Sequence, residues 1–128
     1  MKPNKIHTIL TVNDLNKSKM FYRLLFELDP IIDEENIVEF ELNEFFILGL
    51  VKKELPEVLF DTELLIKYKL NQTSTAELYF ECSNAQEMHK KALQLGSLEL
   101  TPFKERDWGH KVGYSVNHDG QVLAFASI

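Results

Sequence analysis

The feature that most constrains this chain is that its second half repeats the pattern of its first half. Moving the sequence along itself by 70 residues superposes His7 on Glu77, and a shift of 75 residues superposes the turn at 43–44 on the turn at 118–119. Two copies with so long a period are too few for a stacked repeat array, in which many short units pack in a row. The chain is therefore expected to pair two copies of one supersecondary unit.

The first copy spans about residues 5–52 and is predicted to form strand, helix, strand and strand. Alternation of apolar and polar side chains predicts the strands, and three-to-four-residue spacing predicts the helix. Asp14 supplies a helix N-cap, and Pro30 ends the helix, because the residue before proline disfavours helical backbone. The predicted elements are a strand over 6–12, a helix whose apolar stripe holds Phe21, Leu24, Leu25 and Leu28, a strand over 37–42 and a strand over 45–51.

The second copy spans about residues 76–128 and follows a connecting segment at about 53–75. Its helix begins at Ser83–Asn84, with Gln86–Glu87 at capping-box spacing, and Gly96 suits its C-terminal cap. The predicted elements are a strand over 76–82, a helix with the apolar stripe Ala85, Met88, Ala92 and Leu95, a strand over 112–117, a hairpin turn at 118–120 and a strand over 121–128. Together the copies predict one domain over 1–128.

Composition excludes several classes of protein. The chain has 128 residues and a net charge of −6, with no run of Lys or Arg longer than two, which argues against binding to nucleic acid or a membrane surface. Its longest apolar run, at 45–51, is far shorter than the roughly 20 residues of a membrane span. The single cysteine, Cys82, has no disulfide partner in the chain, and residues 1–5 do not lead into a signal-peptide apolar core. A cytoplasmic protein is expected.

The sequence Ile-His-Thr-Ile-Leu-Thr-Val-Asn-Asp-Leu at 6–15, followed by Phe21–Tyr22 and set in two matching copies, resembles the glyoxalase, bleomycin-resistance and extradiol-dioxygenase superfamily, also called vicinal oxygen chelate. The resemblance covers nearly the whole chain. It implies an α+β fold of two βαβββ-type modules, whose curved mixed sheets surround a cleft.

In the metal enzymes of that superfamily, each half supplies one ligand from its first strand and one from its last. Carried over residue by residue, these positions fall on His7 and Glu77 and close to Gly49 and Ala124. The last strand of each copy contains no His, Asp, Glu or Cys, so only two of the four positions carry a donor, fewer than a catalytic metal site usually has. We expect no resident metal. If there is one, the resemblance implies a divalent ion such as Zn, Ni, Mn or Fe held by His7 and Glu77.

A second, narrower resemblance is to bleomycin-resistance proteins, and it rests on Arg-Asp-Trp-Gly-His-Lys at 106–111 and on the hairpin at 117–125. Those proteins sequester a cationic drug without a protein-held metal, in a cleft shared by two chains of a dimer. The chain departs from their pattern at Asp107, where proline is common, and at His118. The resemblance implies a homodimer with Trp108 lining a ligand site.

Strand periodicity indicates which side chains would line such a cleft. If the helices cover Leu10 and Leu78 on the first strands, the alternate side chains face the cleft. That set is His7, Ile9, Thr11, Ile47, Gly49, Val51, Glu77, Tyr79, Glu81, Val122, Ala124 and Ala126. Two carboxylates suit a cationic or hydrogen-bond-donating ligand, and Tyr79 or Trp108 could add a cation–π contact of roughly 0.5–2 kcal/mol. The alternative is that Tyr79 and Glu81 face solvent on an open sheet.

Three functions fit these residues: a metal-independent small-molecule binding protein, a metal-dependent lyase, isomerase or dioxygenase resembling glyoxalase I, and an interaction module with an unused cleft. We expect the first, with a cationic or aromatic ligand at His7, Gly49, Glu77, Tyr79, Glu81, Trp108 and Ala124 and with no catalytic residue assigned. His7 could pair with Glu77, anchor a ligand or act as a base. His89 is expected to be solvated, His110 to border the cleft or begin an exposed strand, and Cys82 to be buried and inert.

Overall fold

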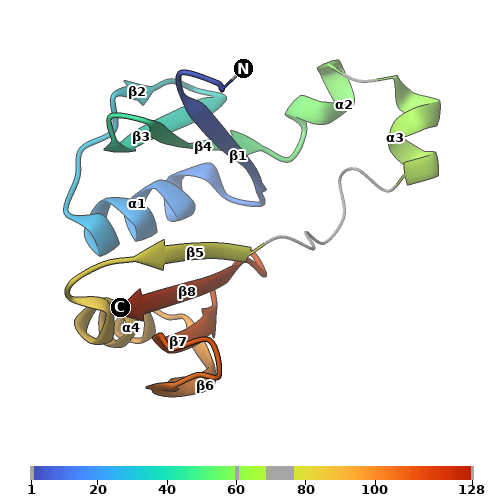
Figure 1. Ribbon diagram of the computed structural model, residues 1–128. Helices are drawn as coiled ribbons and strands as arrows, with labels where there is room; N and C mark the ends of the chain where they lie inside the picture. Colours follow the sequence, from blue (N-terminus) through green and yellow to red (C-terminus); the bar gives the residue numbers. More distant parts are fainter. Residues whose placement is uncertain (1, 60, 69–76, 128) are drawn as a thin grey trace. The chain divides into compact units, whose positions relative to one another are not determined.

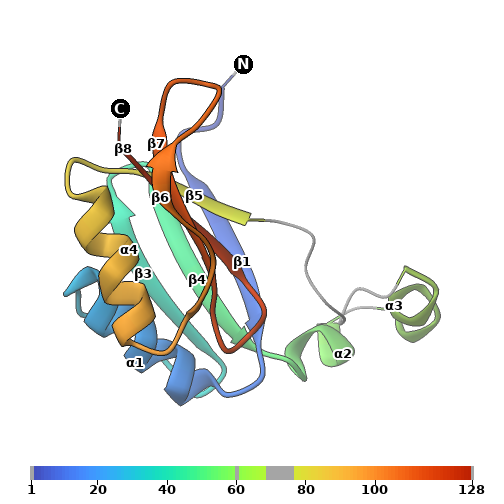
Figure 2. The ribbon, with the colours of Figure 1, turned by 90° about the horizontal axis from the view of Figure 1, so that it is seen from below.

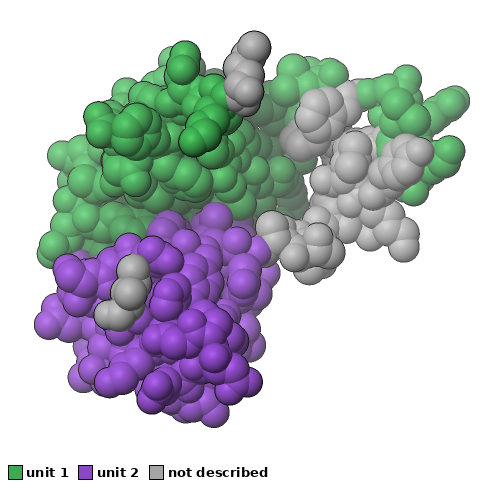
Figure 3. All heavy atoms as spheres, in the orientation of Figure 1, with its two compact units in different colours: residues 1–72 green, residues 73–128 purple. Residues whose placement is uncertain are grey.

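The computed structural model of the protein describes residues 2–59, 61–68 and 77–127 (Figure 1). The chain divides into two compact units, residues 1–72 (unit 1) and residues 73–128 (unit 2), which are coloured separately in Figure 3. Each unit is described by itself below. Ala76 and Ile128, expected at the ends of strands, lie outside the described residues, as do residues 69–75 of the connecting segment. That the two copies form a single domain stays a prediction.

Unit 1 contains a four-stranded mixed sheet with one helix along it (Figures 1 and 2). The strand order is β1-β4-β3-β2; β1 is parallel to β4, and the other neighbours are antiparallel. Its elements are β1 (Ile6–Val12), α1 (Leu15–Phe26), β2 (Ile32–Asp33), β3 (Ile37–Asn43), β4 (Phe46–Lys52), α2 (Leu55–Leu59) and α3 (Thr62–Tyr68).

Unit 2 repeats this arrangement. Its strand order is β5-β8-β7-β6, again with the first strand parallel to the last and the other neighbours antiparallel. Its elements are β5 (Glu77–Glu81), α4 (Ala85–Gln94), β6 (Leu98–Glu105), β7 (Lys111–Val116) and β8 (Val122–Ser127). The fold is thus the expected α+β pair of βαβββ modules.

Strand register confirms the internal repeat residue by residue. In unit 1, Ile9 of β1 lies opposite Gly49 of β4, and in unit 2 Tyr79 of β5 lies opposite Ala124 of β8. These pairs correspond under the 70- and 75-residue shifts of the sequence. The positions expected to line each sheet face are therefore structurally equivalent in the two units.

Helix α1 forms as predicted, but it ends earlier. The Asp14 side chain accepts a hydrogen bond from the Lys17 backbone amide at 3.0 Å, which satisfies one of the unpaired donors of the first turn. The helix ends at Phe26, because Glu27 adopts left-handed backbone with φ 53°. Within the helix, Leu24 is 46% exposed, so the expectation that the whole apolar stripe packs in the core was wrong at this residue.

Three parts of the structure were not predicted from the sequence. Strand β2 has only two residues, and β6 carries register irregularities between Glu99 and Thr101 and between Thr101 and Lys104 that break the alternation of its side chains. Helices α2 and α3 lie in the segment that was read only as a connection. No helix within the described ranges is long and apolar enough to cross a membrane.

Helix α4 covers one face of the unit 2 sheet, and His89 lies at this contact. His89 is only 4% exposed, and its Nε2 atom lies 2.8 Å from Glu99 Oε2 on β6. Its ring packs so closely on β7 that a Cβ atom added to Gly113 would lie 2.5 Å from the His89 Cγ atom. The expectation of a solvated His89 was wrong, because the missing side chain of Gly113 leaves room for the imidazole.

Candidate functional site: the open face of unit 2

The face of the unit 2 sheet opposite α4 carries the largest group of predicted site residues. Side chains alternate along strands. Gly113 lies against His89 of α4, whereas Val112 on the same strand and Ala124 and Ala126 on β8 point to the other side. Those three residues are fully buried, and Tyr79 and Tyr114 pack against them. We call this side, with Glu77, Tyr79, Glu81, Tyr114 and the loop residues Trp108 and His110, the open face of unit 2.

Tyr79 is the centre of a hydrogen-bonded group on this face. The Trp108 Nε1–H group donates to Tyr79 Oη at 3.0 Å, and Tyr79 Oη lies 2.7 Å from His110 Nδ1. The other ring nitrogen of His110 lies 3.9 Å from Glu81 Oε1. The sequence predicted site roles for Tyr79, Glu81 and Trp108. In the structure Trp108 bonds directly to Tyr79, and His110 lies between Tyr79 and Glu81.

A tight turn between β6 and β7 places Trp108 and His110. The Arg106 backbone amide donates to the His110 carbonyl at 2.8 Å, and the Gly109 amide donates to the Arg106 carbonyl at 3.1 Å. Gly109 has φ 90°, a conformation that a side chain would strain. Trp108 remains 56% exposed beside this turn. The indole ring is thus both fixed at its N–H group and open to solvent.

Arg106 and Tyr114 belong to the site but were not identified from the sequence. The Arg106 guanidinium donates twice to the Val112 carbonyl, at 3.2 and 2.8 Å, and lies 5.3 Å from the centre of the Tyr114 ring. Burial raises the pKa of the Tyr114 phenol; the Glu77 carboxylate and Tyr79 add to this rise, and Arg106 opposes it. Tyr114 corresponds to Glu39 under the 75-residue shift, and both lie on the third strand of their unit, whereas the superfamily's ligand positions lie on the first and last strands.

The matching face of unit 1 has different chemistry. His7 Nδ1 lies 3.7 Å from Glu39 Oε2, and Glu39, on β3, is only 8% exposed. The sequence suggested Glu77 as the partner of His7; the carboxylate that the structure places beside His7 is Glu39, and a contact with Glu77 in the other unit stays a prediction. Glu39 was missed because its strand alternates as if its acidic side chains faced solvent.

The residues at the superfamily's ligand positions do not fit a protein-held metal. Gly49 has no donor side chain, and the Ile9 side chain lies over it, with Ile9 Cδ1 2.5 Å from where a Cβ atom would be. Ala124 is fully buried and also has no donor. Within the part of the chain that the structure describes, no three His, Cys, Asp or Glu side chains gather as a metal site would require.

Cys82 lies one residue beyond β5 and is half-buried. Burial raises the pKa of its thiol, which disfavours the nucleophilic thiolate. The Cys82 sulfur lies 3.9 Å from the Phe80 carbonyl oxygen, as a weak donor. The prediction of an unreactive cysteine agrees with this environment, although the side chain is less buried than expected.

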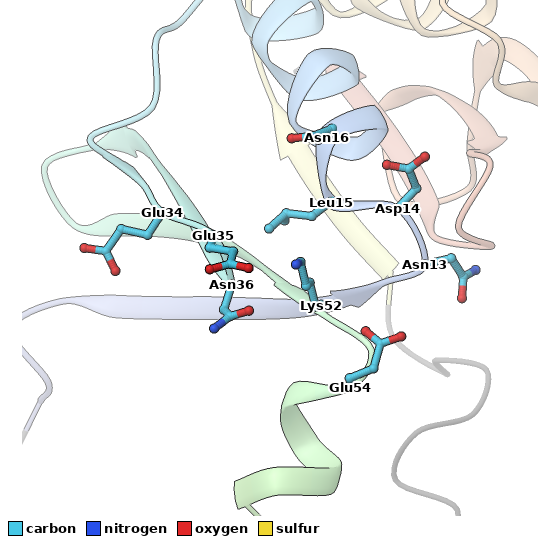
Figure 4. Close-up of a pocket in the computed structure, with 9 residues that line it drawn as sticks. All are labelled: Asn13, Asp14, Leu15, Asn16, Glu34, Glu35, Asn36, Lys52 and Glu54. Atoms are coloured by element: carbon cyan, nitrogen blue, oxygen red, sulfur yellow. The ribbon is translucent and has the colours of Figure 1, made fainter.

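Unit 1 contains a cavity of about 700 Å³ (Figure 4). It is lined by Asn13, Asp14, Leu15, Asn16, Glu34, Glu35, Asn36, Lys52 and Glu54. Figure 4 shows that the lining comes from the start of α1, the turn before β3 and the segment after β4. None of the predicted site residues lines it.

Similar proteins agree with the fold. Residues 6–127 match the family model of the glyoxalase-like domain. A glyoxalase-related enzyme from Fulvimarina pelagi has 20% identity and a TM-score of 0.77, with 95% of this chain and 86% of that chain covered. A glyoxalase/bleomycin resistance protein/dioxygenase family enzyme from Burkholderia phytofirmans PsJN has 14% identity and a TM-score of 0.77, with coverages of 95% and 96%.

A glyoxalase/bleomycin resistance protein from Catenulispora acidiphila has 16% identity and a TM-score of 0.67, with 98% of this chain and 99% of that chain covered. Identities this low show the shared fold and not a shared activity. Among curated proteins, none matches the sequence. The match over residues 6–127 and the paired βαβββ modules show that the chain belongs to the glyoxalase-like domain family of the glyoxalase/bleomycin resistance/dioxygenase superfamily.

Proposed function

We propose that the protein binds a small aromatic cation on the open face of unit 2, without a protein-held metal. The observation that carries this proposal is the combination, on one sheet face, of the exposed Trp108 ring, partly buried tyrosine rings and exposed carboxylates. Glu77 and Glu81 lie two residues to either side of Tyr79 on β5, so all three side chains share a face. Trp108 adds an exposed ring that is fixed to Tyr79.

Each group on the open face would contribute a defined interaction with such a ligand. The rings of Trp108 and Tyr79 offer stacking and cation–π contact, which together favour a flat, positively charged molecule. Glu77 is exposed and shares a sheet face with Tyr79, and its carboxylate adds to the rise in the pKa of Tyr114. Ala124 pairs with both Tyr79 and Tyr114 in the strand register, and both rings pack against the buried cluster that contains it.

The lack of donors at Gly49 and Ala124 supports a metal-independent function over a metal-dependent lyase, isomerase or dioxygenase. Two of the related structures are named as glyoxalase/bleomycin resistance proteins, and a bleomycin resistance protein is in keeping with a binding role. A homodimer and a cytoplasmic location remain parts of this proposal.

The test is binding of phenyltrimethylammonium and benzamidinium, measured by isothermal titration calorimetry. Trp108 is the only tryptophan, so its fluorescence gives a second signal from the site. Glu77→Gln should weaken binding by about tenfold or more, because it removes a charged partner of the ligand. Glu87→Gln, an exposed change in the first turn of α4, makes the same change of charge and should leave affinity unaltered. Equal loss in the two variants, or no binding to the unaltered protein, would contradict the proposal.

A further inference from the structure

We infer that Tyr79 makes the open face selective for aromatic cations that carry an N–H group, such as protonated amines and amidiniums, over quaternary ammonium ions. This inference rests on the proposed function. Its basis is the direction of the hydrogen bonds around the Tyr79 hydroxyl group. That group has one proton to donate and two lone pairs that accept.

The bond from Trp108 has only one possible direction. An indole nitrogen carries a proton and cannot accept, so Trp108 Nε1–H donates to Tyr79 Oη at 3.0 Å. This bond occupies one of the two lone pairs of the Tyr79 oxygen.

The direction of the bond between Tyr79 and His110 follows from Glu81. In neutral His110, one ring nitrogen carries a proton and the other accepts. The Nε2 atom faces the Glu81 carboxylate at 3.9 Å, and a carboxylate favours a proton on the nitrogen that faces it. The proton therefore lies on Nε2, and Nδ1 accepts the Tyr79 proton across 2.7 Å.

One lone pair of Tyr79 Oη is then left over. Its proton points to His110, one lone pair holds the Trp108 N–H, and no other described residue donates to it. A ligand beside Tyr79 meets a hydrogen-bond acceptor and not a donor. An N–H cation can fill this acceptor, whereas the methyl groups of a quaternary ammonium ion leave it without a partner, at a cost.

The two probe ligands differ in this respect and in the shape of the charged group, so the change in preference caused by Tyr79→Phe isolates the N–H contact. Benzamidinium and phenyltrimethylammonium both join a phenyl ring to a single positive charge, but only benzamidinium has N–H groups. At pH 8, benzamidinium should bind more tightly by about tenfold. Tyr79→Phe keeps the ring and removes the acceptor, so it should reduce this preference while both probes still bind. The thermal midpoint of Tyr79→Phe, measured beside that of the unaltered protein, shows that the variant is folded.

The outcomes separate this inference from the function on which it rests. Equal affinity for the two probes, or an undiminished preference in Tyr79→Phe, would overturn the selectivity and leave the binding function standing. If neither probe binds, both are overturned. Nitrogen-15 NMR tests the hydrogen-bond direction without any ligand. A proton on His110 Nε2 is expected, with His110→Gln used to assign the signal, and a neutral ring with its proton on Nδ1 would overturn the inference.

Discussion

Gly49 in β4 and Gly113 in β7 both lie where an added Cβ atom would come within 2.5 Å of a neighbouring side chain. The obstacles differ. At Gly49 the neighbour is the Cδ1 atom at the end of the exposed Ile9 side chain, which can rotate away. At Gly113 the neighbours are Cγ, Nδ1 and Cδ2 of the buried His89 ring, which is bonded to Glu99. A buried ring held in this way has no free direction in which to move.

Alanine substitution should therefore separate the two glycines. Gly113→Ala should lower the free energy of unfolding by about 1–3 kcal/mol, because the methyl group forces the His89 ring out of its packing. Gly49→Ala should change it by less than about 1 kcal/mol, since removing a glycine also restricts the unfolded chain. Urea denaturation of the two variants measures the difference. A loss at Gly49 as large as that at Gly113 would contradict this account of Ile9.

The site residues show how far alternation along a strand can predict function. It placed Tyr79 and Glu81 on one face of the second copy, because side chains two apart in a strand share a side. It could not predict the bond from Trp108 to Tyr79, because that contact depends on the turn at Gly109 between two other strands. It also gave no indication that Glu39 is buried, because a strand pattern does not show which neighbours shield its polar side.

At the scale of elements, the two main helices begin in different ways. The Asp14 side chain caps α1 through the Lys17 amide, whereas the Asn84 side chain makes no capping hydrogen bond to α4. Both were predicted as caps from residue type. The difference lies in the backbone: Asp14 is extended, with φ −132° and ψ 101°, while Asn84 has ψ 38°, away from the extended region typical of N-caps.

The two cap residues give a matched pair of variants. Asp14→Ala should destabilise the protein by about 1 kcal/mol, because it leaves an amide of the first turn of α1 without its partner. Asn84→Ala should cost clearly less, since no side-chain bond is lost. Thermal or urea unfolding of both variants measures the comparison. Equal costs would show that Asn84 caps α4 in solution.

Elements with a clean period were predictable, as were the apolar runs that form β4 and β8, whereas β2 and β6 were not. Strands β1, β3, β5 and β7 alternate, and both main helices have an apolar stripe. Strand β6 alternates poorly, because its bulges shift the register and Leu98 and Leu100 remain exposed. Its pairing with β7 instead depends on the hairpin that joins the two strands, which a short window of sequence does not contain.

For the molecule as a whole, metal binding is the sharpest question that family membership raises. A divalent ion held at a thousandfold excess over its dissociation constant would add about 4 kcal/mol of stability. The donor set at His7, Gly49, Glu77 and Ala124 predicts no such gain. The thermal midpoint should therefore stay the same when Ni²⁺ or Mn²⁺ is added to protein prepared without a metal-affinity tag.

His7→Ala serves as the comparison for this measurement, because His7 is a donor at a family ligand position. A rise in thermal midpoint with metal, absent from His7→Ala, would point to the enzyme class and away from simple binding. A rise of the same size in both proteins would also contradict the prediction, and would indicate a metal site elsewhere in the chain.

The parallel pairing of the first and last strands of each unit bears on how the chain is made. Strand β5 bonds to β8, whose residues follow about 45 positions later, and β8 lies inside the sheet while β5 lies at its edge. Ribosomes add roughly 5–20 residues per second, so β5 waits several seconds for its partner during translation. Unit 1 can complete its sheet during that interval. Newly made β5 therefore keeps its backbone hydrogen-bonding groups without their native strand partner until β8 has left the ribosome.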